Sequence, residues 1–147
     1  MKLSARTCYG TRALVEMARH WNQGPTLLKD IAQNQNISLP YLARLMSPLI
    51  AAGLVRSTRG LHGGVRLTRP PHEIKSGEII RLLEGQVYTR ECVDNPDGCP
   101  QSGTCATRDL WAELGRTVDG LLGSITLQDL VEKQAEKERS REIMYYI

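Results

Sequence analysis

The sequence predicts a mainly α-helical protein with a small β-hairpin wing, arranged as a winged helix-turn-helix plus long dimerisation helices. Three segments with helical apolar spacing open the chain, and two short strands joined by a glycine-rich stretch follow them. A heptad seam then occupies the C-terminal part. The chain has 147 residues and no Phe, so its core rests on Leu, Ile, Val and Ala, which favours helices over a β-sandwich.

The first helix is expected to end before the breaker pair Gly24-Pro25. Its apolar residues recur at helical spacing and form one buried stripe: Tyr9, Ala13, Leu14, Met17, Ala18 and Trp21. A short second helix is expected at about 28–34, and Thr26 is available to cap it.

A third helix is expected to begin at Ser38, whose hydroxyl can accept a first-turn N–H, and to end at Gly53. Pro40 lies in the first turn, where its missing donor costs little. Pro48 lies inside the apolar run and should remove the hydrogen bond to the Arg44 carbonyl. We therefore expect a kink or an early break there.

Two short strands are expected at 54–57 and 65–68, and RGLHGG between them can form a hairpin tip. Helix, helix, helix, hairpin is the element order of a winged helix-turn-helix. Residues 1–70 are therefore expected to form this lobe, with the first helix also in dimer contact. Residues 71–91 should contain a connecting helix at about 75–84.

The heptad seam consists of apolar residues spaced alternately by three and four positions: Trp111, Leu114, Val118, Leu121 and Ile125. Such a seam usually pairs with another helix, which predicts a homodimer. The three glycines within it each cost about 1 kcal/mol relative to Ala, so the interface needs further surface, expected from the first helix. The last helix should open with a capping box at Thr126 and Asp129, and residues 106–147 comprise the dimerisation helices and the C-terminal tail.

Charge is distributed unevenly along the chain. Residues 1–87 carry twelve Lys and Arg against five Asp and Glu, or +7, whereas residues 88–147 carry seven against eleven, or −4. A basic module of this kind suggests a polyanion partner, although a solvated basic face is the alternative. Together with the helix order and the wing, the charge favours double-stranded operator DNA, with no small-molecule substrate.

The third helix is expected to enter the major groove and the hairpin an adjacent groove. Tyr41 and Arg44 are the candidates for base edges, whereas Arg56, Arg59 and Arg66 suit phosphate or minor-groove contact. The full set of predicted DNA contacts is Lys2, Arg6, Ser38, Pro40, Tyr41, Arg44, Arg56, Arg59, Gly60, His62, Gly63 and Arg66.

Other classes of protein are disfavoured. The first twenty residues place a charge every few positions, which leaves no signal peptide or membrane span and predicts a cytoplasmic protein. No glycine-rich nucleotide motif follows a strand, and no acid–base pair or nucleophilic constellation is present, so an enzyme is not expected.

Three of the four cysteines lie in the turn-rich stretch CVDNPDGCPQSGTC at 92–105, with the spacing Cys-x6-Cys-x5-Cys. No Cys-x-x-Cys pair is present, which disfavours a zinc ribbon or a thioredoxin-type centre. Iron-sulfur clusters are held chiefly by thiolates, most often four, and Cys92, Cys99 and Cys105 would supply three of them. Inert buried thiols are the alternative.

The sequence resembles the bacterial winged-helix iron-sulfur regulators typified by IscR, NsrR and RirA. The resemblance rests on MKLSARTCYGTRAL, ISLPYLARLMSPLIAAGLV, RGLHGGVRLTR, GEIIRLLEG, the cysteine loop, LW and ITLQDLV, and so covers nearly the whole chain. It implies a homodimeric transcription regulator, expected to be a repressor, whose cluster is held by the loop cysteines and one further ligand.

The resemblance also guides the search for the fourth ligand. In IscR-like members it is a histidine three residues after the last cysteine, where this chain has Arg108, which cannot ligate. In NsrR-like members it is an acidic residue in the first helix of the partner, and the matching position here is Cys8. We therefore expect Cys8 to complete the site across the dimer, and 4Fe-4S is favoured over 2Fe-2S because this arrangement is NsrR-like. The longer first loop spacing, Ala43 in place of a glutamate, and Pro48 depart from the family pattern.

The expected function is operator binding controlled by this cluster, with sensing of redox state, nitric oxide or iron-sulfur status. The alternative is a cluster-free or zinc-stapled regulator controlled by thiol oxidation or by a partner protein.

Overall fold

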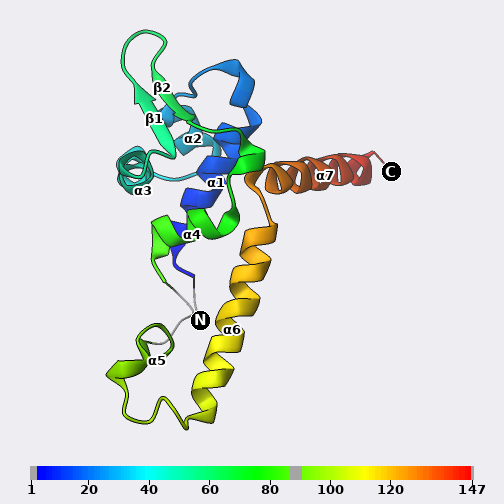
Figure 1. Ribbon diagram of the computed structural model, residues 1–147. Helices are drawn as coiled ribbons and strands as arrows, with labels where there is room; N and C mark the ends of the chain where they lie inside the picture. Colours follow the sequence, from blue (N-terminus) through cyan, green and yellow to red (C-terminus); the bar gives the residue numbers. More distant parts are fainter. Residues whose placement is uncertain (1–2, 87–90, 147) are drawn as a thin grey trace.

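The computed structural model describes residues 3–86 and 91–146 of the chain. Its N-terminal lobe combines the first four helices with a two-stranded wing, and two long helices, α6 and α7, project from this lobe in different directions (Figure 1). The elements of the lobe are α1 (Ala5–Arg19), η1 (Trp21–Gln23), α2 (Leu28–Asn34), α3 (Leu39–Ala51), β1 (Val55–Thr58), β2 (Gly64–Leu67), η2 (Pro71–Glu73) and α4 (Ser76–Glu84). They are followed by α5 (Glu91–Asp94), η3 (Pro96–Gly98), α6 (Ala106–Ser124) and α7 (Leu127–Tyr145). The predicted mainly helical fold with a β-hairpin wing is confirmed.

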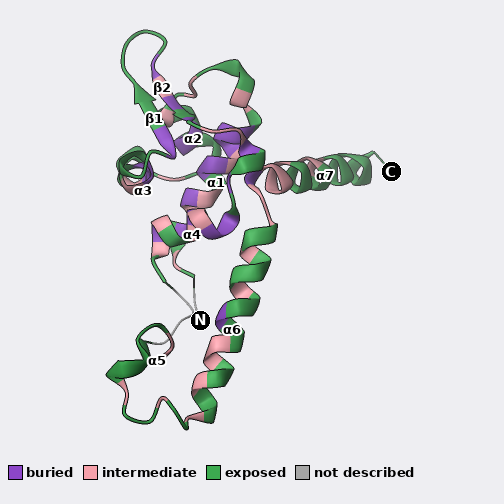
Figure 2. Ribbon diagram, viewed as in Figure 1, coloured by how far each residue is buried: buried purple, intermediate pink, exposed green. Residues whose placement is uncertain are grey.

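One hydrophobic core holds the lobe together, and burial is concentrated there rather than along α6 and α7 (Figure 2). The predicted stripe lies in this core, where Ala13, Leu14, Met17 and Ala18 of α1 are buried. Trp21 is half-buried but belongs to η1, because α1 ends at Arg19. The opposite walls are formed by Leu42, Leu45, Met46 and Leu49 of α3 and by Ile79 and Leu83 of α4. Helix α1 therefore packs at the centre of the lobe, in contact with α3, α4 and α7.

The capping role predicted for Thr26 is wrong. The residue preceding α2 is Leu27, and no side chain caps this helix. Thr26 instead forms an antiparallel bridge with Val65 of β2, in which the two backbone N–H groups donate across the bridge at 2.9 and 2.8 Å. The long-range pairing with the wing thus takes the place of a local cap.

Helix α3 begins as predicted, because the Ser38 side chain accepts a hydrogen bond from the Tyr41 N–H at 3.3 Å. The early break, one of the two outcomes expected at Pro48, does not occur, since the helix continues through it to Ala51. Leu45 and Met46 before the proline and Leu49 after it are all buried. Packing on both sides of the proline therefore favours continuation of the helix although one backbone hydrogen bond is lost.

The wing pairs β1 and β2 in antiparallel register, with Val55 opposite Leu67 and Thr58 opposite Gly64. Each strand is displaced by one residue from the prediction. Gly64 adopts φ 154°, and a Cβ at this position would lie 2.5 Å from the Thr26 carbonyl oxygen. The bridge to Thr26 therefore needs a glycine here.

The turn between α6 and α7 is anchored on the lobe. Ser76 N–H donates to the Ile125 carbonyl at 2.9 Å, and Leu127 N–H donates to the Ile74 carbonyl at 2.8 Å. The predicted capping box of Thr126 and Asp129 is present at the start of α7. Within residues 3–86 and 91–146, none of the helices has the length and apolar character needed to cross a membrane.

Candidate nucleic-acid interface and cysteine loop

Helix α3 has one buried face and one exposed face. Leu42, Leu45 and Leu49 face the core, whereas Pro40 and Arg44 are exposed. The exposed face carries a cation in the second turn, and Ser38 at the start of the helix is exposed as well. This geometry suits a helix that lies in the major groove with its N-terminal half against base edges.

Tyr41 is less available than the sequence analysis assumed. It is half-buried, and its ring meets the ring of Tyr9 on α1 edge to face, with centroids 6.1 Å apart and an interplanar angle of 87°. The guanidinium of Arg12 lies 5.6 Å from the centroid of the Tyr9 ring. Part of the Tyr41 surface therefore packs on α1, and Arg44 is the more accessible candidate for a base contact.

Two arginines stand directly opposite each other on the wing. Arg56 of β1 pairs with Arg66 of β2 in the register, and both are exposed. Like charges at directly opposed positions destabilise a sheet, so this pair favours an anion between or above the guanidinium groups. A hollow of about 350 Å³ lies beside them, lined also by Trp21, Asn22, Gly24, Leu67 and Thr68.

The wing tip comprises Arg59, Gly60, Leu61, His62 and Gly63. Gly60 adopts φ 107°, and a Cβ on Gly63 would lie 2.4 Å from the Thr58 carbonyl oxygen, so both glycines shape the turn. Leu61 is 95% exposed. The sequence analysis missed this residue, although an apolar side chain within the polar hairpin loop RGLHGG could have drawn attention to it. Apolar wedges of this kind can enter the minor groove.

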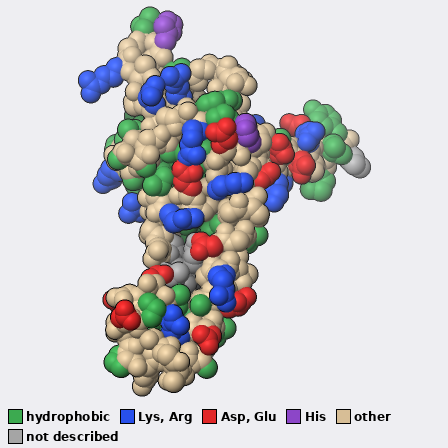
Figure 3. Space-filling view, viewed as in Figure 1, with side chains coloured by type: hydrophobic (Ala, Val, Ile, Leu, Met, Phe, Trp, Pro, Cys, Tyr) green, Lys and Arg blue, Asp and Glu red, His purple; other side chains and the backbone are tan. Residues whose placement is uncertain are grey.

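The other predicted cations lie apart from the wing. Arg6 is exposed in the first turn of α1, and Lys2 lies outside the described residues. On the visible face, Lys and Arg side chains spread over the wing and the adjoining lobe, while Asp and Glu are prominent along α7 and around the cysteine loop (Figure 3). The uneven charge of the sequence thus corresponds to different parts of the folded molecule.

The cysteine loop lies at the end of α6 remote from α7 (Figure 1). Cys92 belongs to α5, Cys99 follows η3, and Cys105 immediately precedes α6. All three are half-buried, Cys8 on α1 is exposed, and none of the four, all of which the structure describes, forms a disulfide.

Two residues after the loop contact its cysteines. The Thr107 hydroxyl lies 3.1 Å from the Cys105 sulfur, and this contact, with the Arg108 backbone N–H, lowers the pKa of the Cys105 thiol. The Arg108 Nε donates to the Cys92 carbonyl at 2.9 Å. Arg108 therefore joins the two ends of the loop, a role that sequence reasoning, which treated it only as a failed ligand, did not find.

The fit of these residues to an iron-sulfur cluster is partial. Three thiols on one closed loop are the right donors for such a cluster, and a lowered pKa favours the thiolate that would ligate. Among the residues that the structure describes, however, no three His, Cys, Asp or Glu side chains gather closely enough to hold a metal ion. The donor chemistry fits, whereas the loop of a single chain does not bring its ligands together.

The predicted seam lies along α6 and at its end. Leu114 and Leu121 are 40% and 59% exposed, while Trp111, Val118 and Ile125 are half-buried. The seam thus leaves apolar surface open to a second helix.

Comparison with known proteins identifies the family. A family model described as Rrf2, iron-dependent transcriptional regulator, matches residues 3–133. The chain belongs to the Rrf2 family. It is a transcription regulator with a DNA-binding winged helix, and not an enzyme.

Two kinds of named Rrf2 relative resemble it about equally. The HTH-type transcriptional regulator CymR of Bacillus subtilis is 39% identical over 147 residues, which is all of both chains. Its solved structure, described as that of the global cysteine regulator, superposes with a TM-score of 0.77 at 40% identity, over 90% of this chain and 98% of that one. The regulator IscR of Serratia proteamaculans is 37% identical over 134 residues, or 91% of this chain and 81% of that protein. The structure of T. potens IscR gives a TM-score of 0.75 at 36% identity, over 93% and 90% of the two chains.

Proposed function

We propose that this Rrf2 regulator binds operator DNA as a homodimer and represses transcription, under the control of an iron-sulfur cluster. Cys92, Cys99 and Cys105 would hold the cluster together with Cys8 of the partner subunit. The observation that carries this proposal is the loop closed by Arg108, which contains three thiols that form no disulfide. The contact with Thr107 lowers the pKa of one of them, the Cys105 thiol. The IscR-like relatives support it.

The chain's own residues suggest how DNA reading would depend on the dimer. Arg44 on α3 would contact base edges, Arg56, Arg59 and Arg66 would position the wing on phosphates, and Leu61 and His62 would lie at the groove. A dimer binds well only when its two reader helices match half-sites about one helical turn apart. A cluster bound by thiolates of both subunits would link the two chains, so a ligand from the partner subunit would restrict the spacing of the two lobes.

A test of the cluster proposal compares the four cysteines one by one. After anaerobic isolation we expect a coloured protein that contains iron and acid-labile sulfide, and Mössbauer spectra typical of 4Fe-4S. The Cys92→Ala, Cys99→Ala and Cys105→Ala variants should lose the visible absorbance because each removes a ligand. The Cys8→Ala variant should shorten the lifetime of the cluster in air.

The outcomes separate the parts of the proposal. A wild-type protein that stays colourless after reconstitution with iron and sulfide would contradict the cluster. Unchanged absorption and cluster lifetime in the Cys8→Ala variant would leave the loop site intact but reject the ligand from the partner subunit. The matched control is Ser102→Ala, which changes a loop residue that cannot supply a thiolate.

A second candidate is regulation by thiol chemistry without a cluster. The match to CymR over the full length of both chains favours it, since that relative is described as a cysteine regulator. Here Cys105, whose thiol pKa is lowered by the contact with the Thr107 hydroxyl, would be a site of reaction with an oxidant. Protein that contains no iron or sulfide, and whose DNA affinity changes on reversible oxidation, would support this function over the first.

A further inference from the structure

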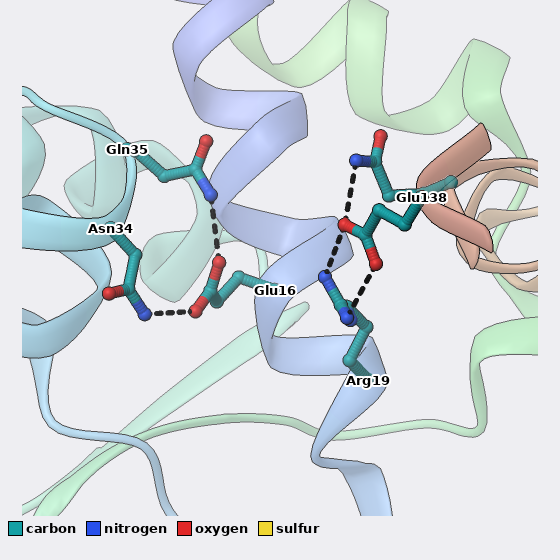
Figure 4. A network of polar contacts seen from close by, with 6 residues as sticks. Glu16, Arg19, Asn34, Gln35 and Glu138 are labelled. Carbon is teal, nitrogen blue, oxygen red and sulfur yellow. Dashed lines mark hydrogen bonds and ion pairs between the residues drawn. The ribbon is translucent and has the colours of Figure 1, made fainter. Parts of the chain in front are cut away.

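A buried carboxylate on α1 faces the turn that leads into the reader helix. Glu16 is only 8% exposed. Its two oxygens accept hydrogen bonds from different side chains, Asn34 Nδ2 at 2.6 Å and Gln35 Nε2 at 2.7 Å (Figure 4). Each oxygen of this carboxylate therefore accepts a hydrogen bond from a residue at the end of α2.

The Gln35 amide is bound at both ends. Its Nε2 donates to Glu16, and its Oε1 accepts from Arg12 Nε at 2.8 Å. Only this orientation satisfies a donor on one side and an acceptor on the other, because a flipped amide would face the guanidinium with its own donors. Arg12 and Glu16, one turn apart on α1, thus hold Gln35 between them.

These contacts lie at the turn of the helix-turn-helix. Asn34 is the last residue of α2, Gln35 is its C-cap, and Asn36 adopts the left-handed conformation with φ 53°. The backbone turns back through the Ile37 N–H, which donates to the Ala32 carbonyl at 3.0 Å, and α3 follows directly from Ser38. The position of residues 34–36 therefore determines the direction in which α3 leaves α2.

Packing alone does not account for a carboxylate here. Burial of a charge is costly, and the C-terminal end of a helix carries a partial negative charge that repels a second one. An apolar residue on α1 would cover α2 without these costs. The two short amide contacts offset them only while Asn34 and Gln35 keep their places, so the arrangement is specific for one conformation of the turn.

We propose that Glu16 and Arg12 are positioning residues for DNA reading, which hold the turn between α2 and α3 through Asn34 and Gln35. In this role both residues act through the turn, and no contact with DNA is required of them. The contacts fix the orientation of α3, and with it Arg44, relative to the rest of the lobe. The inference rests on the DNA-binding function of the family and is independent of any cluster.

A charge-swap cycle tests the proposal. In Gln35→Glu a second carboxylate faces Glu16, so the contact should be lost. Adding Glu16→Gln should restore the contact. The carboxylate at position 35 can then accept hydrogen bonds from Arg12 and from the side-chain amide N–H at position 16. The amide oxygen at position 16 can in turn accept from Asn34. Glu16→Gln alone should be mild, since the exposed Asn34 amide can reverse and accept from the introduced amide.

Affinities are measured for a duplex enriched from a random-sequence pool by the unmodified full-length protein, and for a scrambled duplex at low salt. We expect Gln35→Glu to weaken the selected duplex at least about tenfold and the scrambled duplex by less than about threefold. The double variant should return to within about threefold of the unmodified protein. The matched control Gln33→Glu adds the same charge at an exposed position of α2 and should stay within about threefold as well.

Two results would overturn the proposal. One is a double variant as weak as Gln35→Glu, which would mean that the pair is not coupled. The other is an equal loss on selected and scrambled duplexes, accompanied by melting below the assay temperature, which would mean that the variants only unfold. A positioning role is supported if Gln35→Glu keeps its melting temperature and loses affinity for the selected duplex but not for the scrambled one.

Discussion

At the scale of single residues, Glu84 links the end of α4 to the beginning of α1. Its carboxylate accepts hydrogen bonds from the Ser4 backbone N–H at 3.2 Å and from the hydroxyls of Ser4 and Thr7. These hydroxyl donors, Ser4 first and Thr7 second, hold the pKa of Glu84 below its ordinary value of 4.5. The contact fixes the first turn of α1, next to Cys8, against the helix that precedes the cysteine loop.

The lowered pKa of Glu84 predicts an acid-dependent loss of stability. A carboxylate whose pKa is lower in the folded state stabilises the fold above its unfolded pKa, and this contribution disappears as the pH falls through the folded pKa. We therefore expect Glu84→Gln to lower the melting temperature at pH 7 but to have a smaller effect at pH 3.5. Thermal melts at both pH values check this expectation.

The control for this prediction is Glu142→Gln, which removes an exposed carboxylate near the end of α7. It should change the melting temperature little at either pH. An equal effect of Glu84→Gln at both pH values would contradict the prediction, because the contribution of Glu84 to stability would then not depend on the charge of its carboxylate.

At the scale of elements, local patterns predicted most helices, and long-range contacts account for the errors. The helical stripe of α1, the Ser38 cap and the capping box at Thr126 depend on neighbours within a few residues, and the structure has all three. Thr26 pairs instead with Val65, which is far away in sequence. The Glu16 contacts were missed for the same reason, since a lone Glu in an apolar stripe gives no indication of its partners.

Helix α3 provides a direct test of tertiary packing against local preference. Pro48 removes one hydrogen bond, yet Leu45, Met46 and Leu49 remain buried around it. A proline inside a helix costs about 3 kcal/mol relative to Ala, part of which the surrounding core can relieve. We expect Pro48→Ala to raise the free energy of unfolding by about 1–3 kcal/mol, as measured by denaturant titration.

Ser47→Ala is the matched control, because Ser47 is exposed and, unlike Pro48, has a backbone N–H. It should change the free energy of unfolding by less than about 0.5 kcal/mol. If Pro48→Ala is neutral or destabilising, then the surrounding core is adapted to the proline and the argument from the lost hydrogen bond is wrong.

At the scale of the whole molecule, the spacing of the cysteines identified the loop, but it did not show how two chains could bring a complete set of ligands together. Cys92, Cys99 and Cys105 lie on one loop as the sequence suggests, but α6 carries this loop away from the turn into α7. A ligand from a second chain depends on how two copies meet, and a pattern within one sequence contains no such geometry. The apolar seam on α6 is the part of the proposed homodimer that the sequence indicates.

The seam predicts that α6 supports the proposed homodimer. Leu114 and Leu121 lie at seam positions and expose 40% and 59% of their surface in the single chain. A lysine at either position would place a charge in an apolar helix pair, where burial without a partner is costly. We expect Leu114→Lys with Leu121→Lys to shift the protein from dimer to monomer in sedimentation at micromolar concentration, and to weaken operator binding because the two half-sites would be bound separately.

Gly120→Lys is the control, since it adds a lysine to α6 outside the seam at a position where a Cβ meets no atom within 4 Å. A double variant that remains dimeric would place the interface elsewhere on the molecule, with the exposed apolar end of α7 at Ile143 and Met144 as the next surface to alter.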